Sequence, residues 1–475
     1  MGADTAEHVL PSLCHPHGLR TRPGSAMNPL RNGKPFRIRR QDSETPFCHQ
    51  WRPIIPPAPL ETIRLAAGSA GARPRHVHDP YSKVWFRTME YGDEIVRRVR
   101  ELAPTLAERA PDAERARRLP DATIADLAGT GLFDMLVPKR FGGAELGFEA
   151  MAAACREAGA GCASTGWLSV IYTLHNWMVA LLPEQAQAEV WADRTYALVP
   201  CVLAPTGTAE PADGGHRVTG RWSWGSGVMH AGHVLVMALV TADGEIEPRL
   251  FLLPRAEVAV HDVWHTSGMR GTGSNDIEVQ GVFVPAHRSV PLAELAEGRS
   301  PGSRVHPAPL YRTPLVPVFA LTGAAPVLGV AEGVLARFAE RMQGRVMAYS
   351  GKKQRDLSSA QVRLAAATAD LAAARLLLDD ALRGVVHAVA DGSCDMRLRA
   401  RARLVAAHVA GTSRRVVNDL CAAAGASAQF TGSPFQRAQR DVNTISGHVV
   451  FDPDEAYRLY GRIELGLDPG PVTLV

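Results

Sequence analysis

The apolar residues of this chain change their period twice, and this pattern restricts the fold more than any other feature. Over residues 81–195 they recur at helical spacing, as in LPDATIADLAGTGLFDML, where Ile124 and Leu127 stand three apart. Over residues 196–300 the period falls to two, in runs such as HVLVMALV and IEVQGVFVP separated by Gly, Asp and Pro. Long alanine-rich helical segments return over residues 301–475. We therefore predict an α+β, mostly α fold with an N-terminal helical domain, a central antiparallel β domain and a C-terminal helical bundle.

The first 80 residues differ from the rest of the chain. They are rich in Pro, Gly and Arg and show no sustained apolar period, so we expect an unstructured extension. Because the helical pattern begins only near Val84, translation from Met27 or Met89 is a further hypothesis. The extension carries a formal charge of +5 and the remainder −1. A neutral body does not favour a nucleic-acid partner.

The cysteines and the hydropathy pattern suit a cytoplasmic protein that does not span a membrane. The seven cysteines form no Cys-x-x-Cys pair, which favours reduced thiols over disulfides. No uninterrupted apolar run approaches the ~20 residues that cross a bilayer. We expect no metal site, because the only cluster of ligand type, CHPH at 14–17, lies in the Pro-rich extension.

The segment GRWSWGSGVMHAGH contains two tryptophans and a serine at alternate positions. Trp222, Trp224 and Ser226 are expected on one face of a strand, as an apolar wall with one hydrogen-bonding point. A tryptophan-rich core strand without further function explains the spacing equally simply.

The segment SGMRGTGSNDIEVQGVFVP is a glycine-rich loop that leads into a strand. Its backbone N–H groups, with Arg270, Thr272 and Ser274, could hold an anion. It is not a dinucleotide-binding fingerprint, because a strand follows where a helix is required. An ordinary β-turn is the alternative.

Two histidines are candidates for proton chemistry. His175 lies in the middle of an apolar helical segment, STGWLSVIYTLHNWMVALL, where a core histidine bonded to a backbone carbonyl is the simplest interpretation. His448 follows the helical RDVNTISG and is not needed by the helix pattern; without a function it would lie near the helix C-terminus.

These segments together resemble the acyl-CoA dehydrogenase superfamily from about residue 84 to the end of the chain. The resemblance rests on the three-part order and on WGSG, GMRGTGS, VFVP and RDVN. The long segments CASTGWLSVIYTLHNWMVALLPEQAQAEVWAD and GMRGTGSNDIEVQGVFVPAHR, with the ending GRIELGLDPG, are similar to one branch, the oxygenase components of two-component flavin-dependent monooxygenases. That branch includes the hydroxyphenylacetate and seco-steroid phenol hydroxylases.

The resemblance implies an acyl-CoA dehydrogenase-like fold and roles for four residues around a flavin. Trp224 would pack on the edge of the isoalloxazine, and Ser226 would hydrogen-bond near N5. Thr206, in PCVLAPTGTA, would lie along the pyrimidine side, and Arg270 would also serve the flavin.

The resemblance also suggests why His448 is present. In acyl-CoA dehydrogenases a glutamate nine residues after the Arg of the Arg-Asp pair removes the substrate proton, and here that position is Val449. The monooxygenase branch places a histidine beside it. We therefore predict His448 as the base, with a pKa near 6.5. His175 would orient the substrate or share the proton.

The implied function is monooxygenation of an aromatic, phenolic or polycyclic, small molecule. Reduced FMN or FAD and O₂ would form a C4a-hydroperoxide that transfers one oxygen atom. A separate NAD(P)H-dependent flavin reductase would supply the reduced flavin, and the protein would be a homotetramer.

Three alternatives stay open on sequence grounds. An acyl-CoA dehydrogenase would need a carboxylate elsewhere. An N- or S-oxygenase on the same fold needs less help from a base, and a flavin-binding protein without turnover would give no product.

Overall fold

The computed structural model describes residues 80–470 except 243 and 348, with side chains from residue 90 onward. The predicted extension and its CHPH cluster therefore lie outside the described residues, apart from Pro80. The described residues belong to one compact unit. The predicted order of helical, β and helical segments is confirmed, whereas the domain boundaries at 195/196 and 300/301 stay a prediction.

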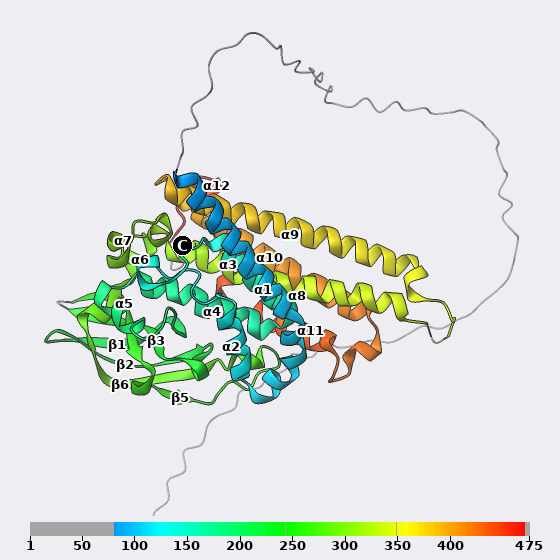
Figure 1. The fold of residues 1–475 in the computed structure, drawn as a ribbon, viewed down its shortest axis with the longest axis horizontal. Coiled ribbons are helices and arrows are strands. Elements are labelled where there is room, and N and C mark those ends of the chain that lie inside the picture. Colours follow the sequence, from blue (N-terminus) through cyan, green and yellow to red (C-terminus); the bar gives the residue numbers. More distant parts are fainter. Residues whose placement is uncertain (1–79, 243, 348, 471–475) are drawn as a thin grey trace, which may run out of the picture. The chain divides into compact units, whose positions relative to one another are not determined.

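Within the described residues, five α-helices precede the sheet: α1 (Pro80–Ala116), α2 (Asp121–Gly129), α3 (Phe148–Gly161), α4 (Ala163–Ala180) and α5 (Glu184–Val190). Every residue of α4 is buried, because this helix contacts α3, α8 and the loop that precedes β6. A helix that is apolar on all sides must be covered on all sides. Figure 1 shows α4 between the sheet and the long C-terminal helices.

The sheet has seven strands: β1 (Cys201–Ala212), β2 (Gly215–Gly225), β3 (His233–Ala242), β4 (Glu245–Pro254), β5 (Ala259–His261), β6 (Asn275–Pro285) and β7 (Ser289–Pro291). Their order is β5-β6-β2-β1-β3-β4-β7. The sheet is not purely antiparallel as we predicted, because β1 and β3 pair in parallel. Strand β2 runs antiparallel to β1 on one side of it. The chain then crosses to the other side of β1 and reverses direction, so β3 runs parallel to β1.

As far as residue 470, seven α-helices follow the sheet: α6 (Leu292–Ala296), α7 (Pro301–Val305), α8 (Leu315–Gly344), α9 (Ser358–Ala390), α10 (Met396–Ala423), α11 (Pro434–Ile445) and α12 (Pro453–Glu464). Helices α8, α9 and α10 lie side by side (Figure 1). Four of the described α-helices begin with a side-chain cap: Ser300, Asp395, Ser433 and Asp452 accept backbone N–H groups of α7, α10, α11 and α12.

Helix α8 is long and apolar enough to cross a membrane by composition alone. However, 83% of its most apolar window is buried inside the protein. It packs against α3 and α10, so it is a core helix of this fold.

Candidate active site

The end of β2 places its two tryptophans on different sides. Trp222 is fully buried and donates its indole N–H to the carbonyl of Met237 at 2.7 Å, whereas Trp224 is 68% exposed. Our expectation of one shared face with Ser226 is therefore wrong. The register of β2 on β6 shifts between Trp222 and Gly225, and Trp224 has a φ of 71°, so the alternation of faces is broken there.

Ser226 heads a chain of hydroxyl groups. Its Oγ lies 2.9 Å from Oγ of Ser274, which lies 2.7 Å from Oγ1 of Thr272, and Thr272 donates to the carbonyl of Met269 at 2.8 Å. On the other side, the indole N–H of Trp167 donates to Ser226 at 3.3 Å. Ser274 thus bonds to both Ser226 and Thr272. Sequence reasoning did not single out Trp167, because nothing distinguishes it within the uniformly apolar α4.

The glycine-rich loop of residues 268–274 is fixed on helix α11. A Cβ atom at Gly268 would lie 2.2 Å from the carbonyl oxygen of Arg440, so only glycine allows this close approach. Asp441 accepts the backbone N–H of Met269 at 2.6 Å, and burial raises the pKa of this carboxyl group to about 6. The Arg-Asp pair of the RDVN motif therefore holds the loop.

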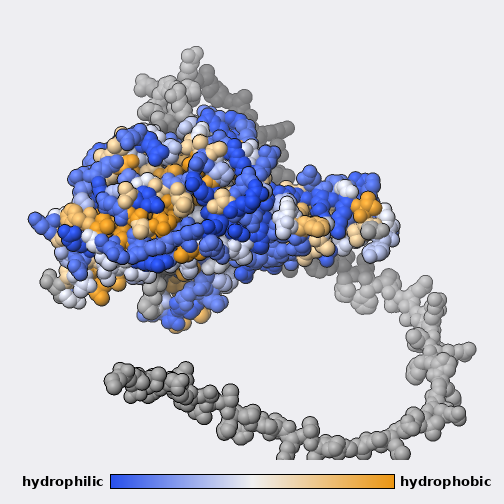
Figure 2. Space-filling view, turned by 90° about the horizontal axis from the view of Figure 1, so that it is seen from below, coloured by the Kyte–Doolittle hydropathy of each residue, from blue (hydrophilic) through white to orange (hydrophobic). Residues whose placement is uncertain are grey.

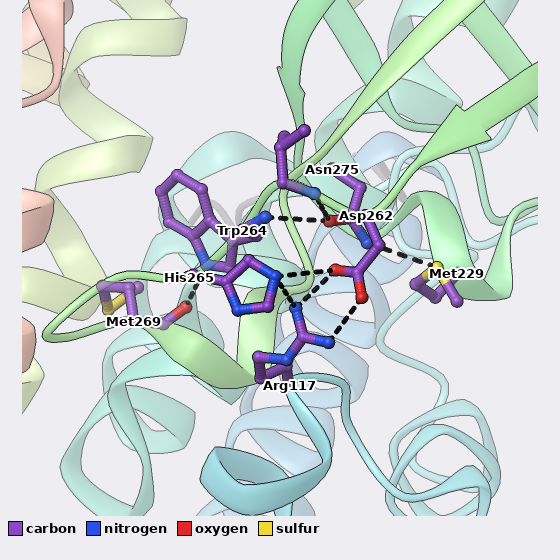
Figure 3. Close-up of polar contacts among 8 residues, drawn as sticks. Arg117, Met229, Asp262, Trp264, His265, Met269 and Asn275 are labelled. Carbon is purple, nitrogen blue, oxygen red and sulfur yellow. Dashed lines mark hydrogen bonds and ion pairs between the residues drawn. The ribbon is translucent and has the colours of Figure 1, made fainter.

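A second set of polar contacts holds the loop from the side of β5 and α1 (Figure 3). The indole N–H of Trp264 donates to the carbonyl of Met269 at 3.0 Å. Asn275 accepts the backbone N–H of Trp264 at 3.1 Å, and Arg117 forms an ion pair with Asp262, with one bond of 2.6 Å. These contacts fix both ends of the segment that carries the hydroxyl chain.

Arg270 lies in the loop of residues 268–274, and Thr206 lies in β1. The Nε atom of Arg270 is buried and has no hydrogen-bond partner among the described residues. Thr206 is exposed and donates its hydroxyl to the carbonyl of Arg221 at 2.8 Å, in the irregular part of β1 between Val202 and Gly207. The Thr206 hydroxyl oxygen keeps its lone pairs for a ligand.

His448 caps the short helical turn Val449–Phe451 instead of ending α11. Its Nδ1 accepts the backbone N–H of Val450 at 3.2 Å, so in the neutral ring the proton is on Nε2. The centroid of the His448 ring lies 5.2 Å from the ring centroid of Trp167. The side chain is accessible to solvent, yet desolvation by surrounding protein lowers its pKa to about 4, below the value near 6.5 that we expected.

His175 has the opposite tautomer. Its Nδ1 lies 2.6 Å from the carbonyl of Val199 and must donate, so the neutral ring keeps a lone pair on Nε2. This Nε2 is buried without a partner among the described residues, and the ring stacks on Phe319. Desolvation lowers the pKa of His175 to about 4.

Trp167 connects most of the predicted site. It contacts both Ser226 and His448, and Trp224 is two residues from Ser226. Arg270 belongs to the loop whose hydroxyl groups reach Ser226. His175 lies further along α4, eight residues or about 12 Å from Trp167.

Two family models match the chain. The acyl-CoA dehydrogenase N-terminal domain matches residues 90–197, and the acyl-CoA dehydrogenase C-terminal domain matches residues 321–453. Together these segments include α4, α11 and both candidate histidines.

Individual proteins give a finer comparison. The pigment production hydroxylase of Rhodococcus sp. is 39% identical over 79% of this chain and 97% of its own length. The FADH₂-dependent resorcinol hydroxylase, oxygenase component, of Rhizobium sp. is 34% identical over 79% of this chain and 95% of its own length. The structure of XiaF from Streptomyces sp. in complex with FADH₂ and glycerol has a TM-score of 0.76 at 29% identity, covering 83% of this chain and 100% of XiaF. The chain therefore belongs to the acyl-CoA dehydrogenase-like flavin-dependent monooxygenases, as an oxygenase component.

Proposed function

We propose that this oxygenase component hydroxylates a phenolic small molecule between His175 and His448, with a reduced flavin held at Ser226. The observation that carries the proposal is the unpartnered Nε2 of His175, a buried acceptor that a substrate hydroxyl group would satisfy. An unsatisfied buried polar group costs about 1–3 kcal/mol, so a ligand that supplies the missing donor gains that amount. The resorcinol hydroxylase among the relatives supports a phenolic substrate.

The residues at the end of β2 and in the loop of residues 268–274 fit a flavin. Exposed Trp224 offers an apolar surface, and the hydroxyl oxygen of Ser226 can bond to N5. The unsatisfied Nε of Arg270 and the free lone pairs of Thr206 are further polar groups for the ring system. When bound, reduced flavin supplies the electrons that activate O₂.

The tautomers suggest how the two histidines divide the proton chemistry. Both pKa values are about 4, so both rings are neutral at pH 7. His175 presents a lone pair and would accept the substrate O–H, whereas His448 presents Nε2–H and would donate. This exchanges the roles expected from the sequence, where His448 was the first choice for the base.

Apolar side chains around His175 would keep water out. His175 is fully buried, its ring stacks on Phe319, and α4 is buried along its whole length. Exclusion of water strengthens the hydrogen bonds inside the site and suppresses side reactions of activated oxygen.

We also propose that copies of the chain associate through α9 into the expected homotetramer. One side of α9 is buried, whereas the opposite side carries an exposed apolar stripe at i, i+4, i+7, i+11 and i+14: Val362, Ala366, Ala369, Ala373 and Leu376. Val362 and Leu376 are 66% and 69% exposed. Figure 2 shows that hydrophobic residues also gather elsewhere on the surface, so the regular spacing, not exposure alone, supports a second helix as the partner of this stripe.

A cytoplasmic location is consistent with the thiols. The described cysteines, Cys155, Cys162, Cys201, Cys394 and Cys421, are all free. Free thiols are typical of a reducing compartment.

One experiment tests the function directly. The purified protein is mixed anaerobically with chemically reduced FMN or FAD and a panel of phenols, sulfides and amines, and then with ¹⁸O₂. We expect a hydroxylated phenol that contains one ¹⁸O atom, and the better flavin identifies the natural cofactor. Labelled sulfoxide or N-oxide without labelled phenol would contradict the proposal, as would the absence of any labelled product with phenols.

A further inference from the structure

The hydroxyl chain behind Ser226 fixes the direction of each of its hydrogen bonds. The carbonyl of Met269 has no proton, so Thr272 must donate to it at 2.8 Å. A hydroxyl group has one proton, so Ser274 donates to Thr272 at the 2.7 Å contact. Ser226 must then donate to Ser274 across 2.9 Å.

The opposite direction is unfavourable. If Thr272 donated to Ser274, its oxygen and the carbonyl oxygen of Met269 would face each other at 2.8 Å with lone pairs alone. The carbonyl cannot turn away easily, because Trp264 donates to it (Figure 3) and Asp441 holds the Met269 N–H. Thr272 and Ser274 are each 2% exposed, so water does not supply other partners.

The consequence at Ser226 is a hydroxyl oxygen that can accept but not donate. Its proton is committed to Ser274, and one lone pair receives the indole N–H of Trp167 at 3.3 Å. A serine hydroxyl has one proton and two lone pairs. Ser226 therefore offers an incoming ligand its second lone pair.

We infer that this chain of hydroxyl groups makes the site select reduced over oxidised flavin. The inference rests on the proposed function, which places Ser226 beside N5. N5 of reduced flavin carries a proton that Ser226 can accept, whereas N5 of oxidised flavin carries a lone pair that repels the oxygen. To donate to oxidised flavin, Ser226 would have to break its bond to Ser274. Thr272 and Ser274 are thus positioning residues that act through Ser226, and they favour release of the flavin once it is oxidised.

The test compares the dissociation constants of oxidised and reduced FMN and FAD, measured by titration, the reduced forms anaerobically. In Ser274→Ala, Ser226 no longer has to donate to Ser274 and can turn its proton to the flavin. We expect oxidised flavin to bind roughly fivefold more tightly than in the wild type, the effect of one net hydrogen bond. Binding of reduced flavin should stay unchanged. Structural damage would instead weaken both forms.

Two substitutions at Thr272 provide a matched control. Thr272→Val keeps the shape but removes the hydroxyl, so Ser274 can donate to Ser226 and the preference should fall as in Ser274→Ala. Thr272→Ser keeps the hydroxyl and should keep the wild-type preference. If Ser274→Ala does not fold, the Thr272 pair decides the question alone.

The outcomes separate this inference from the proposed function. The inference is supported if Ser274→Ala or Thr272→Val binds oxidised flavin more tightly and so shows a smaller preference for reduced flavin. Thr272→Ser must keep the wild-type preference. An unchanged preference, or equal weakening of both flavin forms, overturns it even when the wild type hydroxylates phenols. If the wild type binds neither flavin form, the proposed function fails and the inference fails with it.

Discussion

Ser226 combines two contacts that a core serine would not need. It lies at the end of a strand where the tryptophan before it is exposed, and it joins Trp167 to the hydroxyl groups of the 268–274 loop. Such a residue can hold a ligand atom in a fixed position because its own neighbours leave it one orientation. The proposed ligand atom is N5 of the flavin.

Ser226→Ala should therefore uncouple oxygen use from hydroxylation. The substitution removes one hydrogen bond of about 1 kcal/mol to N5, so the fraction of O₂ released as H₂O₂ should rise severalfold. The ratio of H₂O₂ to product, measured with a peroxidase assay and chromatography, checks this. Ser223→Ala is a suitable control, because Ser223 is exposed on the same strand. Unchanged coupling in Ser226→Ala would mean that the serine only packs.

Asparagine substitutions separate the two histidines, because asparagine can keep the backbone contact of each one. In His175→Asn the amide N–H can still donate to Val199, but the basic nitrogen at the Nε2 position that would accept the substrate proton is lost. We expect about a 10²-fold lower rate of hydroxylation with normal binding of reduced flavin.

In His448→Asn the side-chain oxygen can still accept from Val450, but the shorter side chain places no N–H at the former Nε2 position. A loss of about tenfold, the effect of one hydrogen bond, is expected. Rates come from single-turnover mixing of the reduced complex with O₂ and substrate. A larger loss of hydroxylation rate in His448→Asn than in His175→Asn would instead favour His448 as the base.

The pH dependence follows from the lowered pKa values. His175 accepts a substrate proton only when Nε2 is unprotonated, so the rate should persist through pH 6.5 and fall only as the pH approaches 4. Stability changes in the same direction. Both pKa values are lower in the folded than in the unfolded state, so the unfolded state binds more protons between pH 6.5 and 4. The free energy of unfolding therefore decreases as the pH falls from 6.5 toward 4. Circular dichroism at each pH distinguishes the two effects, and a rate that halves near pH 6.5 in folded protein would contradict the assignment.

At the scale of elements, the sequence predicted the type of each segment, because helix and strand differ in apolar period. The RDVN and WGSG segments lie in α11 and at the end of β2, and both contact the loop of residues 268–274. The sequence did not predict strand pairing, the exposure of single side chains or histidine tautomers, because these depend on long-range contacts or on local backbone conformation. The parallel pairing of β1 with β3 depends on where the chain crosses the sheet, which no local pattern specifies. The opposite exposure of Trp222 and Trp224 depends on a positive φ in a residue that seldom adopts it. Likewise, the tautomer of His175 depends on the distant carbonyl of Val199, and that of His448 depends on the N–H of Val450 in the next turn.

Helix α9 makes an oligomer prediction possible. Leu376→Glu would place a charge in the exposed apolar stripe, where a second helix would have to bury it, so the proposed tetramer should dissociate. Thr368→Glu, on the flank of the same helix, should leave assembly unchanged. Sedimentation velocity or light scattering measures both. A wild-type monomer, or a Leu376→Glu variant that remains tetrameric, would exclude the α9 stripe as the interface.

At the scale of the whole molecule, the site depends on segments from all three parts of the chain. The loop of residues 268–274 is held by Asp441 of α11, by Trp264 beside β5, and through Ser226 by Trp167 of α4. The proposed flavin site would therefore form only when the two helical parts and the sheet pack together. This explains why sequence motifs separated by more than 250 residues carry one function.

The same architecture leaves the reduction of the flavin to another protein. The glycine-rich loop leads into β6 and not into a helix, so its N–H groups do not form the helix N-terminus that binds a dinucleotide pyrophosphate. We therefore expect the purified protein with FMN or FAD to oxidise NADH or NADPH no faster than free flavin does, and to form no product. Adding a flavin reductase, or supplying reduced flavin directly, should restore hydroxylation. Absorbance at 340 nm and product analysis measure both halves of the prediction, and stoichiometric NADH oxidation coupled to product without a reductase would refute it.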